Sequence, residues 1–420
     1  MLNKLAIHGG SKTINTTFKK YNSLGEEERV AVDKVMESGV LSRFIGADSE
    51  DFFGGDNVLK FERSVASYFN VKHAISVNSW TSGLTVSLGA IGISPGDEVI
   101  TTPWTMSATA TAILQWNAIP VFCDIDKKTF CIDPKKIEER ITHKTKAIIA
   151  VDIFGQSSDM LPIMEIANRH SLKVVSDTAQ APGAKYNEKY AGTLAHIGGF
   201  SFNYHKHIHC GEGGVIVTND DDLAYRSKLI RNHGENVIGS KGINNIIGCN
   251  YRLGEIECAI AYEQLKKLDK IILNIQRRSE RLTCGIKHIK GLRTPYIPKG
   301  NTHVYYTYPL ILDLNHIKVS RGDIINALKS EGVPISGGYV NLHTLPIFQE
   351  KIAYGKDNFP WVFCNNESSV SYDVGSLPVA EDMHNNSYMS IPMTMYDFSD
   401  QDIDLIILSF KKVFSNLHTL

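Results

Sequence analysis

Residues 201–214 read Ser-Phe-Asn-Tyr-His-Lys-His-Ile-His-Cys-Gly-Glu-Gly-Gly. The glycines that end this stretch predict a tight turn, and the apolar residues after them predict a short strand. Similar apolar runs lie upstream, and segments long enough for a helix follow several of them, such as 162–170 and, further on, 221–232. The predicted strands cover residues 73–77, 98–102, 120–124, 147–152, 173–177, 199–203 and 214–218.

Strand followed by helix, repeated along the chain, predicts an α/β fold with a mostly parallel central sheet covered by helices. Such sheets bind ligands at the carboxyl ends of their strands, where the motifs described below also fall. Beyond about residue 291 the order of elements changes. Two long helices, 254–268 and 270–288, precede a strand-like stretch at 305–312 and helices near 320–331 and 399–414. We predict a large domain over residues 1–290 and a smaller C-terminal α+β domain over residues 291–420.

The composition excludes several classes of protein. Lys and Arg number 44 against 45 Asp and Glu, so no net charge attracts nucleic acid or an anionic membrane. No apolar run reaches the roughly 18 residues that span a bilayer, and the first residues lack the apolar core of a signal peptide. The seven cysteines form no CxxC pair, which favours a reducing cytoplasm over a disulfide framework.

Residues 174–180, Val-Val-Ser-Asp-Thr-Ala-Gln, predict a buried strand that ends in Asp177. A buried carboxylate there suits pyridoxal phosphate, whose pyridine nitrogen must stay protonated if the ring is to withdraw electrons. Gln180, three residues on, is placed to reach the ring hydroxyl of that cofactor. An aspartate at the end of a parallel strand is often only a loop-facing carboxylate, so this assignment depends on a lysine nearby.

Lys206, in the quoted stretch, is that lysine. A lysine amine forms a Schiff base with the cofactor aldehyde and then moves a proton between substrate and cofactor carbons. Burial and the neighbouring cofactor cation are expected to lower its pKa enough for both tasks.

Two further segments suit the phosphate of the same cofactor. Residues 77–84, Val-Asn-Ser-Trp-Thr-Ser-Gly-Leu, predict a strand that leads into a helix. Thr81 and Ser82 lie where a helix N-terminus offers N–H groups and hydroxyls to a phosphate, although a plain N-cap is the alternative. Residues 248–255, Gly-Cys-Asn-Tyr-Arg-Leu-Gly-Glu, come just before a long helix.

In order and spacing, these segments resemble the DegT family of sugar aminotransferases, which share the aspartate aminotransferase fold (fold type I of pyridoxal-phosphate enzymes). The family pattern Ser-Phe-x-x-x-Lys-x-x-x-x-Gly-Glu-Gly-Gly is met by Ser201, Phe202, Lys206 and residues 211–214. The shorter patterns Asp-x-Ala-Gln, Asn-x-Arg and Pro-x-Ala-Glu are met by Asp177, Ala179, Gln180, Asn250, Arg252, Pro378, Ala380 and Glu381. The resemblance runs from about residue 20 to the end of the sequence.

The resemblance implies roles for these residues. Lys206 and Asp177 are the expected catalytic pair, and Ser201 is expected to contact the phosphate. Asn250 is expected to reach the phosphate of the cofactor in a neighbouring subunit, so the active enzyme would be a homodimer with sites built from both chains.

The sequence departs from the family pattern at two positions. Trp80 stands where relatives usually carry glycine, as a packing substitution or as part of a reshaped substrate entrance. Met106 stands where an aromatic residue commonly stacks on the cofactor ring, and its thioether can lie against a π face.

Several histidines leave alternatives open. His205, His207 and His209 alternate, so on a strand they would share one face, as metal ligands do. Because the matched motif assigns this loop to the cofactor, we expect no metal, and we expect His205 to assist proton transfer or to bind the sugar. His343 matches a place where relatives often have a substrate-side histidine, although a structural role is equally open. We expect Arg252 to form a structural ion pair.

The sequence thus predicts a pyridoxal-phosphate aminotransferase that takes nitrogen from an amino acid such as L-glutamate, passing through the pyridoxamine phosphate form. The expected acceptor is a keto sugar, nucleotide-linked, used for cell-surface polysaccharide or unusual amino sugars. A branch of the family carries histidine in place of the lysine and removes a hydroxyl group from the sugar, so Lys206 favours transamination. The alternatives are a sugar dehydratase, a non-catalytic cofactor-binding regulator and, more distantly, a metal-dependent hydrolase.

Overall fold

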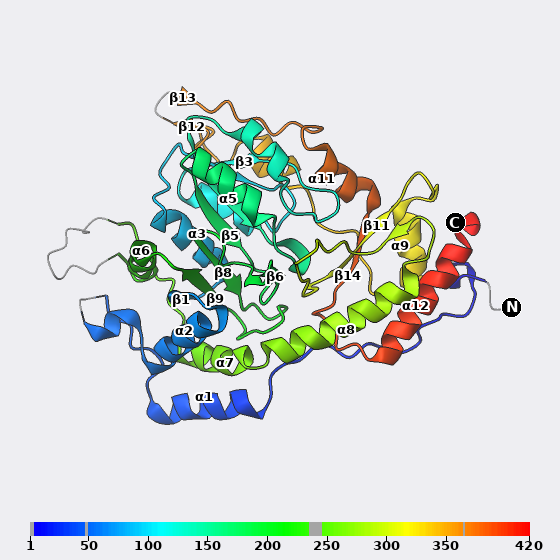
Figure 1. The fold of residues 1–420 in the computed structure, drawn as a ribbon, viewed down its shortest axis with the longest axis horizontal. Coiled ribbons are helices and arrows are strands. Elements are labelled where there is room, and N and C mark those ends of the chain that lie inside the picture. Colours follow the sequence, from blue (N-terminus) through cyan, green and yellow to red (C-terminus); the bar gives the residue numbers. More distant parts are fainter. Residues whose placement is uncertain (1–3, 47–48, 235–245, 364–365) are drawn as a thin grey trace.

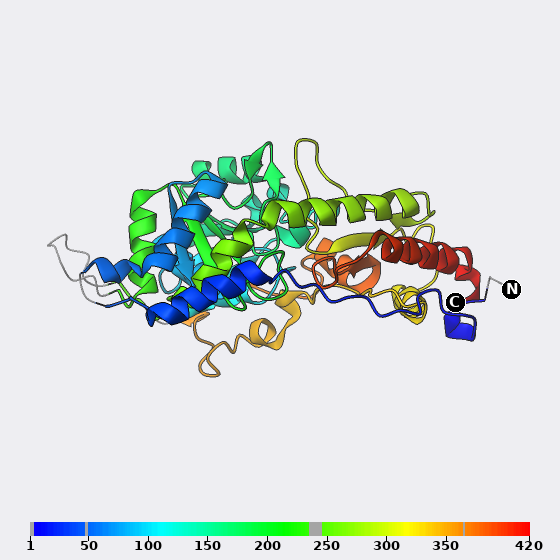
Figure 2. The ribbon, with the colours of Figure 1, turned by 90° about the horizontal axis from the view of Figure 1, so that it is seen from below.

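The computed structural model describes residues 4–46, 49–234, 246–363 and 366–420. Figure 1 shows a larger part with a central sheet and a smaller part around strands β11 and β14, beyond which the C-terminus lies. The turned view in Figure 2 shows the N-terminal segment running along the molecule from the smaller part to helix α1 (Glu26–Ser38) under the larger part.

The larger part contains a sheet of seven strands in the order β1-β9-β8-β5-β4-β2-β3. Each strand corresponds to one of the seven apolar runs in the sequence. Their bounds are His73–Val77 (β1), Glu98–Thr101 (β2), Ile119–Phe122 (β3), Thr145–Val151 (β4), Lys173–Asp177 (β5), Ile197–Ser201 (β8) and Gly214–Thr218 (β9). The pairs β2–β3, β2–β4, β4–β5 and β5–β8 are parallel, whereas β9 is antiparallel to both β1 and β8. The predicted mostly parallel α/β sheet is confirmed.

One predicted strand is displaced along the chain. The sequence placed it at residues 199–203, whereas β8 ends at Ser201. The chain turns immediately afterwards, because the N–H of Lys206 donates to the carbonyl oxygen of Asn203 (2.9 Å). The earlier end leaves Lys206 on a loop beyond the carboxyl end of the sheet.

Helices cover both faces of this sheet because alternate residues of each strand point to opposite sides. Ile149 of β4 packs in the core cluster under α3 (Trp80–Ala90) and α4 (Ala108–Gln115). Its neighbour Ile148 packs in a cluster under α5 (Met160–Arg169) on the other face. Further along that second face, α2 (Asp56–Phe69) and α7 (Glu255–Leu265) cover β1, β8 and β9, while α6 (Asp221–Arg231) packs against α3.

The smaller part is built on an antiparallel sheet of three strands, β10 (Leu292–Arg293), β11 (Tyr308–Leu312) and β14 (Tyr388–Ile391). Helices α9 (Arg321–Ser330) and α12 (Asp400–Ser415) pack against it. The long helix α8 (Leu268–Ile286) connects the parts, because its first residue lies in a core cluster of the larger part and Ile286 in that of the smaller (Figure 1).

Two chain segments join parts that lie far from them in sequence. Leu5, Ile14 and Phe18 are buried in the core of the smaller part. The segment at residues 342–377 contributes Phe348 and Trp361 to a hydrophobic cluster at the β3 edge of the larger sheet. Both segments cross the predicted boundary at residues 290/291, because the N-terminal segment packs in the smaller part and residues 342–377 pack on the larger part. The division into two domains at that boundary stays a prediction.

No helix within the described part of the chain is long and apolar enough to cross a membrane. Six of the cysteines lie in the described residues and are free, whereas Cys364 lies outside them.

Candidate active site

A cavity of about 300 Å³ opens at the carboxyl ends of β5 and β8. The end of β5 contributes Asp177, the end of β8 contributes Ser201, and the loop after β8 contributes Lys206. The other predicted residues that line it are Thr81, Met106, Gln180 and His205. The sheet thus gathers residues that lie up to 125 positions apart (81 to 206) around one space, as expected of a parallel sheet.

Lys206 is buried, with 7% of its surface exposed. Its Nζ lies 4.4 Å from the centre of the Tyr306 ring. Burial lowers the pKa of this amine to about 8, and the negative charge of Asp177 opposes that shift. A large fraction of the amine is therefore neutral, and so nucleophilic, near pH 8.

Asp177 is held by three donors. Trp80 Nε1 and the N–H of Ala179 donate to Oδ1 (2.7 and 3.3 Å), and Thr109 Oγ1 donates to Oδ2 (2.8 Å). Burial raises the pKa of this carboxyl, while the hydrogen bonds from Thr109 and Trp80 lower it. Neither Trp80 nor Thr109 was predicted to contact Asp177. The contact of Thr109 with Asp177 could not be recognised from the Thr-x-x-x-Thr spacing at 105–109, because threonines on a helix are common.

Gln180 is oriented by two partners. Its Oε1 accepts from the N–H of Phe154 (2.9 Å), and its Nε2 donates to the hydroxyl of Tyr339 (2.7 Å). Tyr339 and Tyr306 both line the cavity and come from the chain beyond α8. Sequence analysis missed both, because isolated tyrosines in that region are indistinguishable from core residues.

Two predicted phosphate contacts differ in position. Thr81 lines the cavity, whereas Ser82 does not. The N–H of Ser82 donates to Ser79 Oγ, the N-cap of α3 (3.0 Å). The N-cap of α3 is therefore Ser79 rather than Thr81 or Ser82, and of these two predicted residues Thr81 lines the cavity.

The loop that carries Lys206 is fixed on both sides. Thr394 Oγ1 donates to the carbonyl oxygen of His205 (3.0 Å). The hydroxyl of Tyr21 donates to the carbonyl oxygen of His207 (2.7 Å). A third contact comes from Gln264, whose Oε1 accepts the N–H of His209 (3.4 Å).

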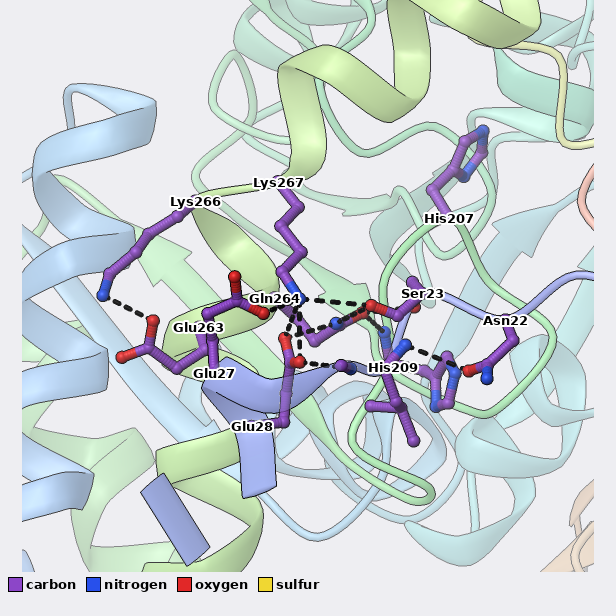
Figure 3. A network of polar contacts seen from close by, with 12 residues as sticks. Asn22, Ser23, Glu27, Glu28, His207, His209, Glu263, Gln264, Lys266 and Lys267 are labelled. Atoms are coloured by element: carbon purple, nitrogen blue, oxygen red, sulfur yellow. Dashed lines mark hydrogen bonds and ion pairs between the residues drawn. The ribbon is translucent and has the colours of Figure 1, made fainter. Parts of the chain in front are cut away.

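Figure 3 shows how that contact continues into helix α1. The Oε1 of Gln264 also accepts from Ser23 Oγ (2.5 Å), and its Nε2 donates to Glu28 (2.7 Å). Glu28 is buried and forms an ion pair with Lys267 (2.7 Å). The lysine loop, the N-terminal segment and the junction between α7 and α8 are therefore held in one polar network.

The three alternating histidines lie on the loop after β8 and not on the strand that one shared face of metal ligands would require. His207 is buried and its Nε2 donates to the carbonyl oxygen of Val304 (2.8 Å), whereas His205 lines the cavity. Burial and the charge of Lys206 lower the pKa of His205 to about 4, so its imidazole is neutral at pH 7. Within the described ranges, no group of three or more His, Cys, Asp and Glu is placed to hold a metal ion.

His343 does not line the cavity. It is fully buried, and its Nε2 lies 3.0 Å from Glu381 Oε1. The same carboxylate accepts the N–H groups of Gly375 (2.8 Å) and Leu377 (3.2 Å). This geometry favours the structural alternative for His343, in which Glu381 of the Pro-x-Ala-Glu pattern holds His343 and a nearby turn.

Asn250 is exposed and does not line the cavity of its own chain. Its Oδ1 accepts from Nε of Arg252 (2.8 Å), and Arg252 also reaches Asn232 Oδ1 (3.4 Å). Among the residues that the structure describes, Arg252 therefore bonds two amides, and no carboxylate partner of the expected ion pair is found there.

Comparison with known proteins identifies the family. The DegT/DnrJ/EryC1/StrS aminotransferase family matches residues 25–395. This chain belongs to that family. It is 35% identical over 347 residues to the spore coat polysaccharide biosynthesis protein SpsC of Bacillus subtilis. This match covers 80% of this chain and 86% of SpsC. It is 37% identical over 293 residues to a GDP-perosamine synthase of Caulobacter vibrioides, covering 70% of this chain and 78% of that enzyme.

Among solved structures, NtdA from Bacillus subtilis with bound cofactor PMP superposes with a TM-score of 0.77 at 26% identity, covering 96% of this chain and 87% of that one. The chain is therefore a pyridoxal-phosphate-dependent enzyme of the sugar aminotransferase family, as its sequence predicted.

The cavity of this aminotransferase fits that cofactor. A buried carboxylate and a buried amine with a lowered pKa face the same space, as the ring nitrogen and the aldehyde require. The hydroxyl-bearing residues Thr81 and Ser201 line the same cavity, where they suit the phosphate.

Proposed function

We propose that this aminotransferase moves an amino group from L-glutamate to a nucleotide-linked keto sugar, for cell-surface polysaccharide or amino-sugar synthesis. The observation that carries the proposal is the shared cavity of Lys206 and Asp177 at the carboxyl ends of β5 and β8. The relatives support the sugar acceptor, since one is named for spore coat polysaccharide biosynthesis and another for GDP-perosamine synthesis.

When bound, pyridoxal phosphate supplies a protonated ring that withdraws electrons from the carbon that gains or loses a proton. In the proposed reaction Asp177 keeps the proton on the ring nitrogen, and the neutral Nζ of Lys206 accepts a proton from one carbon and returns it to another. With the cofactor bound, Gln180 would contact the ring oxygen, and Thr81 and Ser201 would hold the phosphate. Met106 is the proposed cover of the ring, and the neutral imidazole of His205 is a proposed contact of the sugar.

We further propose that the enzyme is a homodimer in which Asn250 of each chain completes the site of the other. This role is supported because Asn250 is exposed and is not among the residues that line the cavity of its own chain. Exposed apolar side chains also gather on and beyond α1, as on a surface that a second copy covers, namely Val30, Met36, Val40, Leu41 and Ile45.

An absorbance spectrum of the protein with pyridoxal phosphate, before and after excess L-glutamate, tests the amino-transfer half. We expect the band of the lysine-bound cofactor to be replaced by that of pyridoxamine phosphate, and Lys206→Ala to abolish the change. If neither glutamate nor any other amino acid changes the band, the sugar dehydratase or regulatory alternative replaces this proposal. With acceptors, a product that loses oxygen rather than gaining nitrogen would identify the dehydratase.

Shared sites are tested by mixing two inactive variants, Lys206→Ala and Asn250→Ala, after dissociation and reassociation. A mixed dimer then holds one site with both residues intact, so activity returns. Mixed samples that stay inactive, although a sizing experiment detects the mixed dimer, would contradict the proposal.

A further inference from the structure

Trp80 is the first residue of α3 and stands where relatives usually carry glycine. Its indole is buried, with 4% of its surface exposed, and its Nε1 donates to Asp177 Oδ1 over 2.7 Å. The departure from the family pattern therefore brings a new hydrogen-bond donor to the carboxylate that faces the cofactor ring.

A buried indole N–H usually finds some acceptor, so the bond alone does not distinguish a functional role from packing. The other three tryptophans show the ordinary outcome. They donate to neutral acceptors, namely the carbonyl oxygens of Tyr339 and Thr85 and the hydroxyl of Tyr372, from Trp104, Trp116 and Trp361 respectively. Of the four tryptophans, Trp80 alone donates to a carboxylate, and that carboxylate is Asp177.

The surrounding chain leaves room for this indole. A Cβ at Gly83, in the same helix, would lie 2.5 Å from Cε3 of Trp80 and 2.8 Å from Cζ3. Glycine disfavours a helix relative to alanine, so its presence there has a local cause. At Gly199 of β8 a Cβ would lie 2.2 Å from Cζ3 of Trp80, and also 2.1 Å from the carbonyl oxygen of Val215.

We infer that Trp80 is a positioning residue whose N–H keeps Asp177 ionised, so that the proton stays on the cofactor's ring nitrogen. The inference rests on the role of Asp177 in the proposed function. Burial favours the protonated carboxyl, and hydrogen bonds to the charged form oppose it. Trp80 acts on Oδ1 and Thr109 on Oδ2, so each carboxylate oxygen has its own side-chain donor. Without the indole N–H, Asp177 becomes a stronger base and draws the proton away from the ring.

The test uses pyridoxal phosphate labelled with ¹⁵N in the ring, because the chemical shift of that nitrogen reports its protonation directly. In Trp80→Phe we expect the proton shared by Asp177 and the ring nitrogen to shift about tenfold towards Asp177, so that a smaller fraction of the ring nitrogen is protonated at pH 7 than in the wild type. Trp116→Phe is the matched control, since it also loses an indole hydrogen bond but lies away from Asp177. We expect it to titrate as the wild type does.

The experiment distinguishes a failure of the role inferred for Trp80 from a failure of the role proposed for Asp177. If Trp80→Phe titrates as the wild type does while Asp177→Asn releases the ring proton, the role of Trp80 is wrong and that of Asp177 stands. If Asp177→Asn also changes nothing, the proposed function of Asp177 fails. Should Trp80→Phe not fold, the double variant with Gly83→Ala carries the same test, because the added methyl fills space that the indole leaves.

A measurement on the wild type needs no substitution. With ¹⁵N-labelled tryptophan, the indole signal of Trp80 is expected to move as the ring nitrogen titrates, whereas that of Trp116 stays fixed. A Trp80 signal that is unchanged through the titration would overturn the inference.

Discussion

The hydroxyl of Tyr21 lies 2.7 Å from the carbonyl oxygen of His207, so the N-terminal segment is tied to the residue that follows Lys206. Tyr21 is largely buried, and this burial raises the pKa of its phenol to about 12. The hydroxyl therefore stays protonated, and can donate, at neutral and moderately alkaline pH. A loop that must present a buried amine is thus fixed by a residue 186 positions away.

Replacing that phenol tests the contact. Tyr21→Phe leaves a carbonyl oxygen without its donor, so we expect the free energy of unfolding to fall by about 1 kcal/mol. Urea denaturation of the apoprotein measures the change. Tyr296→Phe, at a half-exposed tyrosine, is the control and is expected to stay within about 0.5 kcal/mol of the wild type. Equal stabilities of all three proteins would contradict a role for the bond.

The rate at which the apoprotein captures pyridoxal phosphate is expected to depend on the charge of Lys206. Because its pKa is lowered to about 8, the amine is protonated at lower pH and cannot attack the aldehyde. Stopped-flow absorbance is expected to show a rate that rises with pH and levels off above about pH 8. Asp177→Asn removes the charge that opposes the lowering, so its curve is expected to lie at lower pH. A wild-type midpoint near the ordinary lysine value of 10.5 would contradict this prediction.

The same lowered pKa predicts that Lys206 destabilises the apoprotein. Between pH 8 and 10.5 the unfolded chain binds the proton that the folded chain releases, so stability is expected to rise with pH across this window. Below about pH 8 the penalty is fully present. Lys206→Met is therefore expected to raise the free energy of unfolding at pH 7 by on the order of 3 kcal/mol. Lys411→Met, at an exposed lysine of α12, is the control, and a gain of equal size there would contradict the assignment.

Much of the fold and part of the site follow from the sequence for a physical reason. Apolar runs mark buried parallel strands, and residues just after such strands meet at one edge of the sheet, which brings Asp177 and Lys206 together. The missing parts come from long-range packing. Nothing local marks Tyr306 or Tyr339 as cavity residues, because tertiary contact alone turns them from core-like aromatics into walls of the site. The burial of Phe18 in the smaller part is equally invisible in local pattern.

The contact between His343 and Glu381 predicts a structural role for both. Glu381→Gln weakens the acceptor for His343 and for two backbone N–H groups, so we expect a loss of about 1–3 kcal/mol in the free energy of unfolding. Cofactor affinity and the KM for the acceptor are expected to stay unchanged at a temperature where the variant is folded. If His343→Asn instead raises the acceptor KM without lowering stability, the histidine contacts the substrate after all.

Met106 gives the last prediction, because it lines the cavity while 55% of its surface is exposed. If its side chain covers the cofactor ring, an aromatic replacement offers a larger, more rigid face, worth about 0.5–1 kcal/mol of stacking. We therefore expect Met106→Phe to bind pyridoxal phosphate a few-fold more tightly, and Met106→Ala to bind it more weakly than the wild type. Fluorescence titration of the apoprotein measures both affinities. Leu161→Ala, at a similarly exposed apolar residue on α5, is the control. Unchanged affinity in both Met106 variants would place the ring cover elsewhere among the residues that line the cavity.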